Sequence, residues 1–352
     1  MKLTADVFLE RAARWPVLDV RSPGEYTAGH VPGAHCFPLF DDRERAQVGT
    51  TYKQIGAHEA LLVGLELVGP KMRSLVEQAR HVAPNKEVLV HCWRGGMRSE
   101  SVAWLLTTAG FTAHTLTGGY KAYRNHVLGS FQDNPQLVLL GGATGSGKTA
   151  VLRALRERGE QVIDLEALAR HRGSVFGGIG QGEQPTTEQF QNDLHHAWRQ
   201  LDPSARVWVE DESFSIGQAK LPLELWNVMK ASPLVVLEVP RAARIERLVQ
   251  EYGALDPLAL ERAVVAIQKR LGGLRTQQTL TALAHGQLDE AADHLLTYYD
   301  KSYGRCLKKS HHGPVVRAST PVGDACRNAA LVLEAVSNFS TVKTQDSPTI
   351  YG

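Results

Sequence analysis

One cysteine and two arginines fall in a short segment that could carry nucleophilic chemistry, residues 91–99, HCWRGGMRS. The apolar residues before Cys92 predict a buried strand, and an apolar-periodic helix is predicted from about residue 99 to residue 109. A loop between a strand and a helix N-terminus directs main-chain N–H groups and the positive end of the helix dipole at one place. Both effects lower the pKa of a thiol, so Cys92 is predicted to be a nucleophilic thiolate, with Arg94 and Arg98 binding an oxyanion. The alternative is an ordinary buried cysteine in a turn.

A second segment, residues 142–149 with the sequence GATGSGKT, has the spacing of a phosphate-binding loop. It lies between a predicted strand, 137–140, and a predicted helix that ends near residue 159, which is the context such a loop requires. The glycines let the main chain wrap a diphosphate, the lysine supplies a positive charge, and the threonine hydroxyl usually meets Mg²⁺. The predicted diphosphate-binding residues are Gly142, Gly145, Ser146, Gly147, Lys148 and Thr149. The motif indicates a bound diphosphate rather than ATP hydrolysis, because a prenyl diphosphate satisfies the same contacts.

Three acids, Glu210, Asp211 and Glu212, follow an apolar strand predicted at 206–209. A strand that ends in acids resembles a Walker B element, in which a carboxylate supports Mg²⁺ directly or through a neighbouring group. Any of the three could play that part. Alternatively, they pair with Arg170 or Arg172.

Strands alternate with helices in both halves of the chain, which predicts an α/β fold with two parallel sheets. The polar segment 125–136 carries a glycine and a proline and marks the expected boundary between the halves. Further strands are expected at 161–164 and 234–239, and a helical region is expected from about 257 to 310. We predict an N-terminal domain over 1–130, a P-loop domain with a helical C-terminal part over 136–340, and a flexible tail over 341–352.

The composition is that of a globular chain: of the 352 residues, 43% are hydrophobic and 22% charged, with a net charge of +2. These values exclude wholesale disorder and give no bulk basic charge that would favour nucleic acid. No apolar run approaches a membrane span and no secretory signal is visible, so we expect a cytoplasmic protein without membrane contact. The sequence leaves the oligomeric state open, and we expect a monomer. Four cysteines in so long a chain predict reduced thiols rather than a disulfide framework. Cys306 and Cys326 lack metal-ligand spacing to any histidine pair, which predicts no zinc site.

Two segments upstream of the cysteine loop, 17–26 (VLDVRSPGEY) and 29–34 (GHVPGA), resemble the signature of rhodanese-like sulfurtransferase domains. The resemblance covers about residues 1–130 and implies a persulfide-type or related chalcogen intermediate on Cys92. Within it, the charged residues of the two segments are expected to be framework residues for the loop: Asp19, Arg21, Glu25 and His30.

The cysteine loop departs from the common rhodanese pattern in one respect. Arg98 stands six positions after Cys92, whereas common single-domain rhodaneses have an arginine five positions after the cysteine. Cys-x5-Arg-Ser is also the spacing of cysteine phosphatases, whose larger loop cradles a tetrahedral phosphate. The loop therefore fits either a phosphatase-like module or an acceptor pocket for a phosphate-bearing chalcogen donor such as selenophosphate.

The order of a rhodanese-like half followed by a P-loop half, with the segments 164–174, 184–190 and 209–213, resembles the tRNA 2-selenouridine synthase family. The resemblance implies a tRNA-modifying transferase that converts wobble 2-thiouridine into 2-selenouridine in two steps. Geranyl diphosphate first alkylates the sulfur, and selenium from selenophosphate then replaces the S-geranyl group. Alkylation comes first because a thiocarbonyl sulfur leaves poorly, whereas an alkylated sulfur leaves as a thiol. The P-loop would hold the geranyl diphosphate, and Cys92 would take selenium from selenophosphate as a selenyl sulfide and present it to the carbon being substituted.

Contacts to tRNA must come from local charge. The stretch 301–318 holds five basic residues and no acid, with tyrosines in or beside it, and could neutralise phosphates and stack an anticodon base. The alternative is a solvated helix face with the tyrosines on the core side. The predicted tRNA contacts are Arg170, Arg172, Lys301, Arg305, Lys308 and Lys309.

A different class of function is kept as the alternative, a P-loop kinase or NTPase with a regulatory rhodanese or Cys-x5-Arg phosphatase-like module. That protein would turn over nucleotide independently of tRNA. A phosphatase would also need a general acid, which the sequence does not locate.

Overall fold

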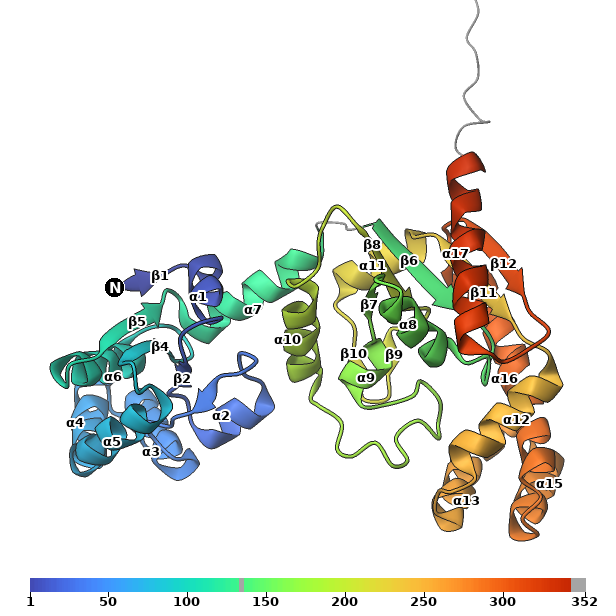
Figure 1. The fold of residues 1–352 in the computed structure, drawn as a ribbon. Coiled ribbons are helices and arrows are strands. Elements are labelled where there is room, and N and C mark those ends of the chain that lie inside the picture. Colours follow the sequence, from blue (N-terminus) through green and yellow to red (C-terminus); the bar gives the residue numbers. More distant parts are fainter. Residues whose placement is uncertain (133–135, 343–352) are drawn as a thin grey trace, which may run out of the picture. The chain divides into compact units, whose positions relative to one another are not determined.

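The computed structural model describes residues 1–132 and 136–342, and the chain forms two compact units (Figure 1). The first comprises Met1–Ser130 with Gln191–His196, and the second comprises Phe131–Phe190 with Ala197–Gly352. Each contains a five-stranded sheet whose paired strands are all parallel, which confirms the predicted α/β class. No helix in these described residues is long and apolar enough to cross a membrane.

The sheet of the first unit has the strand order β1-β5-β4-β2-β3. Strands β2 and β4 are short segments buried on both faces, as inner parallel strands covered by helices must be, whereas the edge strand β3 is exposed. Val88, Leu89 and Val90 of the central strand are fully buried. The strands are β1 (Lys2–Leu3), β2 (Val17–Asp19), β3 (His35–Cys36), β4 (Glu87–His91) and β5 (Thr112–Leu116).

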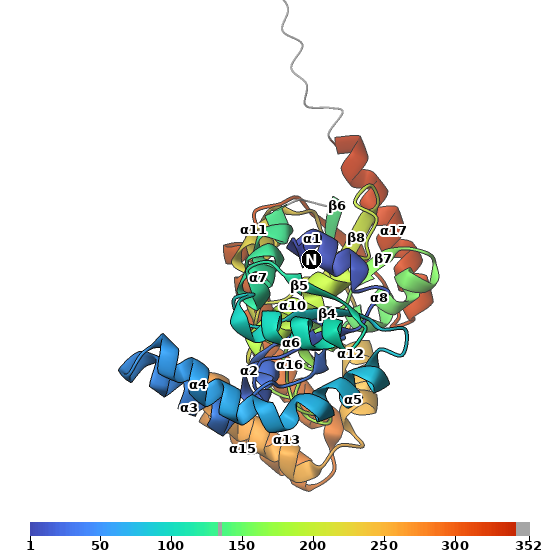
Figure 2. The same ribbon diagram turned by 90° about the vertical axis from the view of Figure 1, so that its left-hand side faces the viewer.

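Seven α-helices surround this sheet. Helix α6 begins with the residues that follow the cysteine loop, and its buried Val102 and Leu106 pack with Leu75 of α5 into the core. Helices α3 and α4 pack against each other and run side by side in Figure 2. The helices are α1 (Ala5–Arg11), α2 (Pro23–Ala28), α3 (Asp42–Gln54), α4 (Ala57–Val68), α5 (Met72–Val82), α6 (Met97–Thr108) and α7 (Gly119–Gly129).

The sheet of the second unit has the order β12-β11-β6-β8-β7, so the strand before the P-loop lies at its centre. The strands expected from the sequence are present, and β12 adds an edge strand that the sequence pattern did not indicate. A separate antiparallel pair, β9 (Ser215–Ile216) and β10 (Ala219–Lys220), follows the acid-bearing strand. The sheet strands are β6 (Gln136–Gly141), β7 (Gln161–Ile163), β8 (Arg206–Glu210), β11 (Leu234–Glu238) and β12 (Val315–Ser319).

The helices of the second unit form two groups. Helices α8 and α17 pack on the sheet through Leu152, Leu155 and Val332, whereas α13, α15 and α16 build a second core around Leu260 and Val264. Helix α17 runs to Val342, and residues 343–352 of the predicted tail lie outside the described residues. The helices are α8 (Lys148–Glu157), α9 (Leu165–Ala169), α11 (Leu223–Ala231), α12 (Arg241–Tyr252), α13 (Pro257–Ala266), α14 (Gln268–Leu271), α15 (Gly273–Ala284), α16 (Leu288–Ser310) and α17 (Ala325–Val342). Helix α10 (Thr187–Trp198) is divided, since its residues Gln191–His196 belong to the first unit.

Candidate functional site

Cys92 follows the carboxyl end of β4, and its side chain is 3% exposed at the base of a loop that leads into α6. Its Sγ lies 3.2 Å from the Oγ of Ser99 in the first turn of that helix. Gly95 turns the loop with φ of 65°, a conformation that favours glycine. A Cβ on Gly95 would come within 2.4 Å of the carbonyl of Leu116, and a Cβ on Gly119 would come within 2.3 Å of the Gly95 nitrogen. The loop is therefore clamped against the start of α7.

The surroundings of Cys92 favour its thiolate. Burial raises the pKa of the thiol. Hydrogen bonds from the Ser99 side chain and from the N–H groups of Ser99 and Arg94, together with the charge of Arg98, lower the pKa by more than burial raises it. The net result is a pKa below the ordinary value for cysteine. The thiolate is the nucleophilic form, so this geometry supports the predicted reactivity of Cys92.

Arg98 is held in place by Glu25, a residue for which the sequence suggested only a framework role. The Arg98 Nη1 donates to Glu25 Oε2 over 2.9 Å, and Arg45 Nε lies 3.5 Å from the same oxygen. Burial raises the pKa of Glu25, but the two arginines and the N–H of Ser22 bring it below the ordinary value. Glu25 is thus ionised at neutral pH and fixes the guanidinium of Arg98 beside the cysteine loop.

Asp19 and Arg21 form the expected framework. Both side chains are fully buried, and Arg21 donates from Nε and Nη2 to the Asp19 carboxylate over 2.9 and 2.6 Å. The guanidinium also lies 3.7 Å from the ring centre of Tyr120 and donates to the carbonyl of Gly29. This ion pair connects β2 to the end of α2 behind the loop, and neither residue lines the cavity that opens onto Cys92.

In the second unit, the predicted phosphate-binding loop joins β6 to α8. Gly145 and Gly147 have φ of 79° and 82°, and Lys148 Nζ donates to the carbonyl of Gly142 over 2.9 Å. A Cβ on Gly147 would lie 2.7 Å from the guanidinium of Arg247, so this arginine closes over the loop. Five of the six predicted diphosphate-binding residues line one cavity of about 390 Å³: Gly142, Gly145, Gly147, Lys148 and Thr149. The sixth, Ser146, is buried beneath the loop.

The three acids after β8 have different surroundings. Asp211 and Glu212 line the P-loop cavity. Glu210 is fully buried and accepts a hydrogen bond over 2.9 Å from the N–H of Leu165, which assigns it a structural part in joining β8 to the start of α9. A fourth acid, Glu166, lines the same cavity and accepts a hydrogen bond over 2.9 Å from the Thr149 hydroxyl.

Sequence reasoning missed Glu166, although a signal was present. Residues 164–166 follow β7, and the carboxyl ends of neighbouring parallel strands meet at one edge of a sheet, where ligands bind in α/β folds. An acid just after a strand of a parallel sheet is therefore a candidate whenever a P-loop lies on the same edge.

The acids around Lys148 carry more negative charge than it can balance. Burial raises the pKa of Glu212 to about 7, the charges of Glu166 and Asp211 add to the rise, and Lys148 opposes it. The pKa values of Asp211 and Glu166 are also raised, chiefly by burial. A site with surplus carboxylate oxygens and a threonine hydroxyl suits a hard divalent cation such as Mg²⁺. Among the described residues no three His, Cys, Asp or Glu side chains are grouped to hold a metal alone, so diphosphate and water would supply the other ligands.

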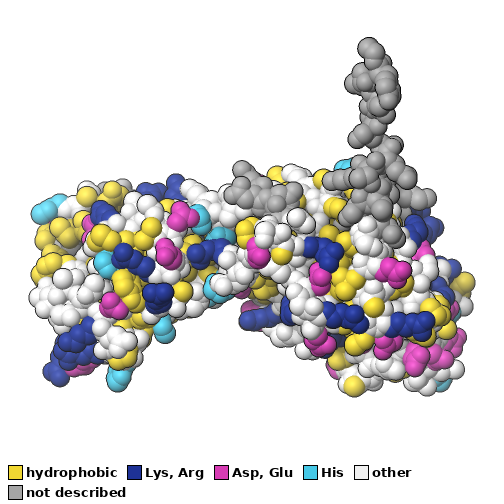
Figure 3. All heavy atoms as spheres, turned by 45° about the horizontal axis from the view of Figure 1, so that its top comes forward, with side chains coloured by type: hydrophobic (Ala, Val, Ile, Leu, Met, Phe, Trp, Pro, Cys, Tyr) yellow, Lys and Arg dark blue, Asp and Glu magenta, His cyan; other side chains and the backbone are white. Residues whose placement is uncertain are grey.

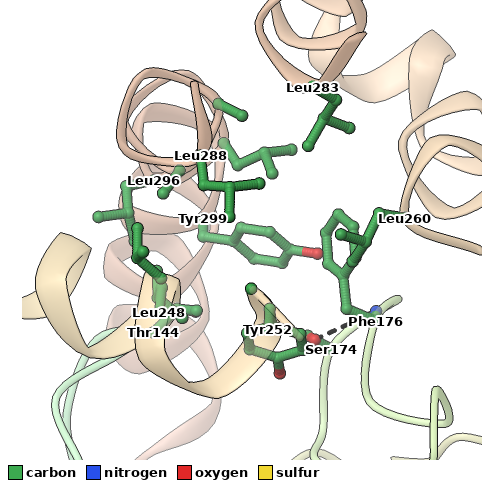
Figure 4. Close-up of a pocket in the computed structure, with 15 residues that line it drawn as sticks. Thr144, Ser174, Phe176, Leu248, Tyr252, Leu260, Leu283, Leu288, Leu296 and Tyr299 are labelled. Atoms are coloured by element: carbon green, nitrogen blue, oxygen red, sulfur yellow. Dashed lines mark hydrogen bonds between the residues drawn. The ribbon is translucent and has the colours of Figure 1, made fainter. Parts of the chain in front are cut away.

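An apolar slot adjoins the P-loop cavity (Figure 4). Tyr299 reaches across it from α16 toward Phe176 and Leu260, with Leu283 and Leu288 above. The slot is narrow, with a volume of about 70 Å³. Its mouth is shared with the P-loop cavity, since five residues line both: Thr144, Ser174, Leu248, Tyr252 and Tyr299.

The predicted tRNA contacts are dispersed. Arg172 lines the P-loop cavity, whereas Arg170 has φ of 49° and donates to the carbonyl of Glu183. Lys301 and Arg305 are exposed on α16, and the side chains of Lys308 and Lys309 lie outside the described residues.

The tyrosines of that stretch, Tyr298, Tyr299 and Tyr303, line the P-loop cavity, which favours the interpretation of α16 as a helix with its tyrosines turned inward. On the face shown in Figure 3, basic side chains are interspersed with acidic and apolar ones.

The fold and the two loops define a two-domain group-transfer protein, with a cysteine nucleophile loop on one α/β unit and a diphosphate-binding loop on the other. The rhodanese-like domain model matches residues 4–126, and the model of the tRNA 2-selenouridine synthase AAA domain matches residues 135–322. The chain belongs to the tRNA 2-selenouridine synthase family.

Three relatives, each named tRNA 2-selenouridine synthase, illustrate the similarity. The protein from Shewanella oneidensis is 34% identical, covering 89% of this chain and 91% of its own. The protein from Bdellovibrio bacteriovorus is also 34% identical, covering 84% and 90%. The protein from Bordetella petrii is 37% identical, covering 82% and 86%.

Proposed function

We propose that this enzyme converts the wobble 2-thiouridine of tRNA into 2-selenouridine through an S-geranyl-2-thiouridine intermediate, with geranyl diphosphate and selenophosphate as co-substrates. The observation that carries the proposal is the shared mouth of the P-loop cavity and the apolar slot. A diphosphate on the loop places a linked hydrocarbon chain at the mouth of a narrow apolar slot. A purine ring would find few polar partners there.

In the first step, the thiouridine sulfur attacks the first carbon of the geranyl chain, the bond from that carbon to oxygen breaks, and diphosphate leaves. The proton on N3 of the thiouridine is released. Lys148 and Arg247 stabilise the negative charge that develops on the departing diphosphate. Mg²⁺, when bound beside Thr149, Asp211 and Glu212, would supply further positive charge at the leaving group.

In the second step, we assign the nucleophile to Cys92. Selenium in selenophosphate is already at the selenide level, and a selenyl sulfide on Cys92 would need a two-electron oxidant. Attack of the Cys92 thiolate on phosphorus needs none: the sulfur–phosphorus bond forms, the phosphorus–selenium bond breaks, and hydrogen selenide anion leaves. Water then hydrolyses the phosphocysteine to thiol and phosphate. Selenide is a weakly basic leaving group, so this step requires no general acid.

The hydrogen selenide anion then attacks C2 of the S-geranyl nucleotide. The new C2–selenium bond forms, geranyl thiolate leaves with the C2–sulfur bond, and the selenium-borne proton moves to N3. The thiolate takes a proton and departs as geranylthiol. For tRNA contacts, the exposed Lys301 and Arg305 and the cavity-lining Arg172 remain our candidates.

The test is nucleoside mass spectrometry after incubation of the full-length protein with thiolated tRNA and geranyl diphosphate, with and without selenophosphate. We expect S-geranyl-2-thiouridine without selenophosphate and 2-selenouridine with it. Absence of both nucleosides would overturn the proposal. ATP or GTP hydrolysis that proceeds without tRNA would instead support the P-loop NTPase alternative.

A further inference from the structure

The N-terminal unit carries a large groove whose character does not match selenophosphate. The groove has a volume of about 960 Å³, and Cys92 lies at its base. Its walls come from α3, α4, the segment before α3 and the cysteine loop itself. Selenophosphate is a small anion that needs the cysteine loop and its arginines but not a groove of this size.

Most of the groove surface is apolar, and several of its large side chains are exposed. Leu65 of α4 is 60% exposed, Met97 of α6 is 64% exposed and Tyr52 of α3 is 62% exposed. Leu61, one helical turn before Leu65, lines the same wall. Exposed apolar side chains gathered in one groove mark a site for an apolar ligand or partner.

Charged groups stand beside the apolar walls. Lys53, Arg45, Arg94 and Arg98 line the groove with a single acid, Asp42. Asp42 accepts a hydrogen bond over 2.9 Å from the N–H of Gly24, and Arg45 and Arg98 share Glu25 as an ion-pair partner, so the groove keeps a net positive charge. An occupant with an apolar chain and phosphates fits this combination better than an apolar protein segment does.

The position of Cys92 restricts the occupant further. A molecule in this groove lies against the thiol of the selenium step, and the proposed nucleotide partner of that step carries a ten-carbon chain on sulfur. We propose that the groove binds the geranyl chain of the S-geranyl-2-thiouridine during selenium transfer, while its arginines and Lys53 meet the RNA phosphates. This inference rests on the proposed function and gives the chain a second prenyl site, distinct from the apolar slot beside the P-loop.

The groove also has a part in the chemistry. When hydrogen selenide anion forms the C2–selenium bond, the C2–sulfur bond breaks and geranyl thiolate is released. Contact along the whole chain holds C2 beside the place where selenide is released, which favours the bond-forming step by proximity.

The test uses the full-length protein, selenophosphate and two RNA oligonucleotides that differ only in the group on sulfur, S-geranyl or S-methyl. We expect the wild type to give 2-selenouridine from the S-geranyl substrate with the lower KM. Leu61→Asp and Leu65→Asp should raise the KM for the S-geranyl substrate about tenfold or more and leave the S-methyl reaction unchanged. Leu62→Asp is the matched control, because Leu62 is 42% exposed on the same helix but does not line the groove.

The outcomes separate this inference from the proposed function. If the wild type forms no 2-selenouridine from either substrate, the proposed selenium step fails and the groove inference falls with it. If the wild type reacts but Leu65→Asp matches it on the S-geranyl substrate, only the groove inference is overturned. Equal losses on both substrates would show a general defect, and a change of oligomeric state with Leu65→Asp would show that the groove joins copies of the chain. Either result would overturn the inference, whereas an unchanged S-methyl reaction, which uses Cys92 of the same unit, shows that this unit folds in the variants.

Discussion

Ser99 is the residue on which the reactivity of Cys92 most depends. Its hydroxyl lies 3.2 Å from the sulfur, and its N–H also contributes to the lowered pKa of the thiol. The rhodanese resemblance assigns roles to the cysteine and the arginines, and the motif contains Ser99 without indicating a role for it. A hydroxyl at this place stabilises the thiolate and, in the proposed phosphoryl transfer, helps it to leave phosphorus.

We predict that Ser99→Ala raises the pKa of Cys92, because the thiolate loses a hydrogen bond. The rate of Cys92 alkylation by iodoacetamide, followed by peptide mass spectrometry across pH, reports this pKa separately from the other cysteines. Ser101→Ala is the control, since the Ser101 hydroxyl donates to the carbonyl of Arg98. An unshifted alkylation profile in Ser99→Ala would contradict the prediction.

Glu212 makes the P-loop unit sensitive to pH. Its pKa is about 7 in the folded protein against 4.5 for the exposed group, so the folded state favours the protonated form. The contribution to stability is complete below about pH 4.5 and is lost as the pH rises through 7. We therefore expect the Tm of Glu212→Gln to fall less than that of the wild type between pH 5 and pH 7.5.

Thermal unfolding at the two pH values, without ligand, measures this difference. Glu157→Gln on the exposed face of α8 should keep the pH dependence of the wild type. Equal falls in Tm for Glu212→Gln and the wild type would show that the Glu212 carboxyl does not titrate in this range.

At the scale of elements, the apolar slot is made by helices that are far apart in the sequence. Phe176 follows α9, whereas Leu260, Leu283 and Tyr299 come from α13, α15 and α16. The spacing of these residues is that of any helix buried on one face, so nothing in the sequence distinguishes a slot from a filled core. The phosphate loop differs because its function needs consecutive residues with positive φ angles. Such angles favour glycine, so the loop is visible in the sequence as a run of glycines.

Features made by consecutive residues could be predicted from the sequence, whereas contacts between residues far apart in the chain could not. The strand–loop–helix units around Cys92 and Lys148 follow from apolar runs bounded by glycines, and both are present. The different surroundings of Glu210, Asp211 and Glu212 depend on where β8 ends, at Glu210, and on the contact of Leu165 with Glu210. That contact joins β8 to the start of α9 through the fold, and a pattern along the chain does not contain it.

Narrowing the slot should select against long prenyl chains. We predict that Leu283→Trp raises the KM for geranyl diphosphate about tenfold, because the larger side chain occupies the space of the distal isoprene unit, and that dimethylallyl diphosphate is used as before. Leu274→Trp, on the same helix but 73% exposed and outside the slot, is the matched control. Steady-state alkylation of thiolated RNA with the two diphosphates provides the measurement, and equal effects on both would argue against chain binding in the slot.

At the scale of the whole molecule, each unit contains its own sheet, its own core and its own candidate site. The two steps should therefore be separable by single substitutions. We predict that Lys148→Ala lowers alkylation by about 10²–10³ through loss of charge stabilisation and leaves selenation of S-geranyl RNA intact. Cys92→Ser should abolish selenation of S-geranyl RNA and leave alkylation intact.

A mixture of the two variants provides a direct check. Mixed Lys148→Ala and Cys92→Ser proteins should convert thiolated tRNA into 2-selenouridine, because the first site of one molecule and the second site of another remain intact. Each variant alone should not. If Cys92→Ser alone still formed 2-selenouridine, the assignment of the nucleophile would be wrong.

The back-to-back contact of Gly95 and Gly119 has a consequence for how this chain can change over generations. A side chain at either position would meet the main chain of the other within 2.8 Å, so neither glycine can be exchanged unless the main chain of the loop moves. A lineage that retained the reaction would accept variation in the groove walls long before it accepted alanine at Gly119. A natural sequence of this family with a larger residue at Gly119 would indicate a protein whose cysteine loop has a different conformation and a different function.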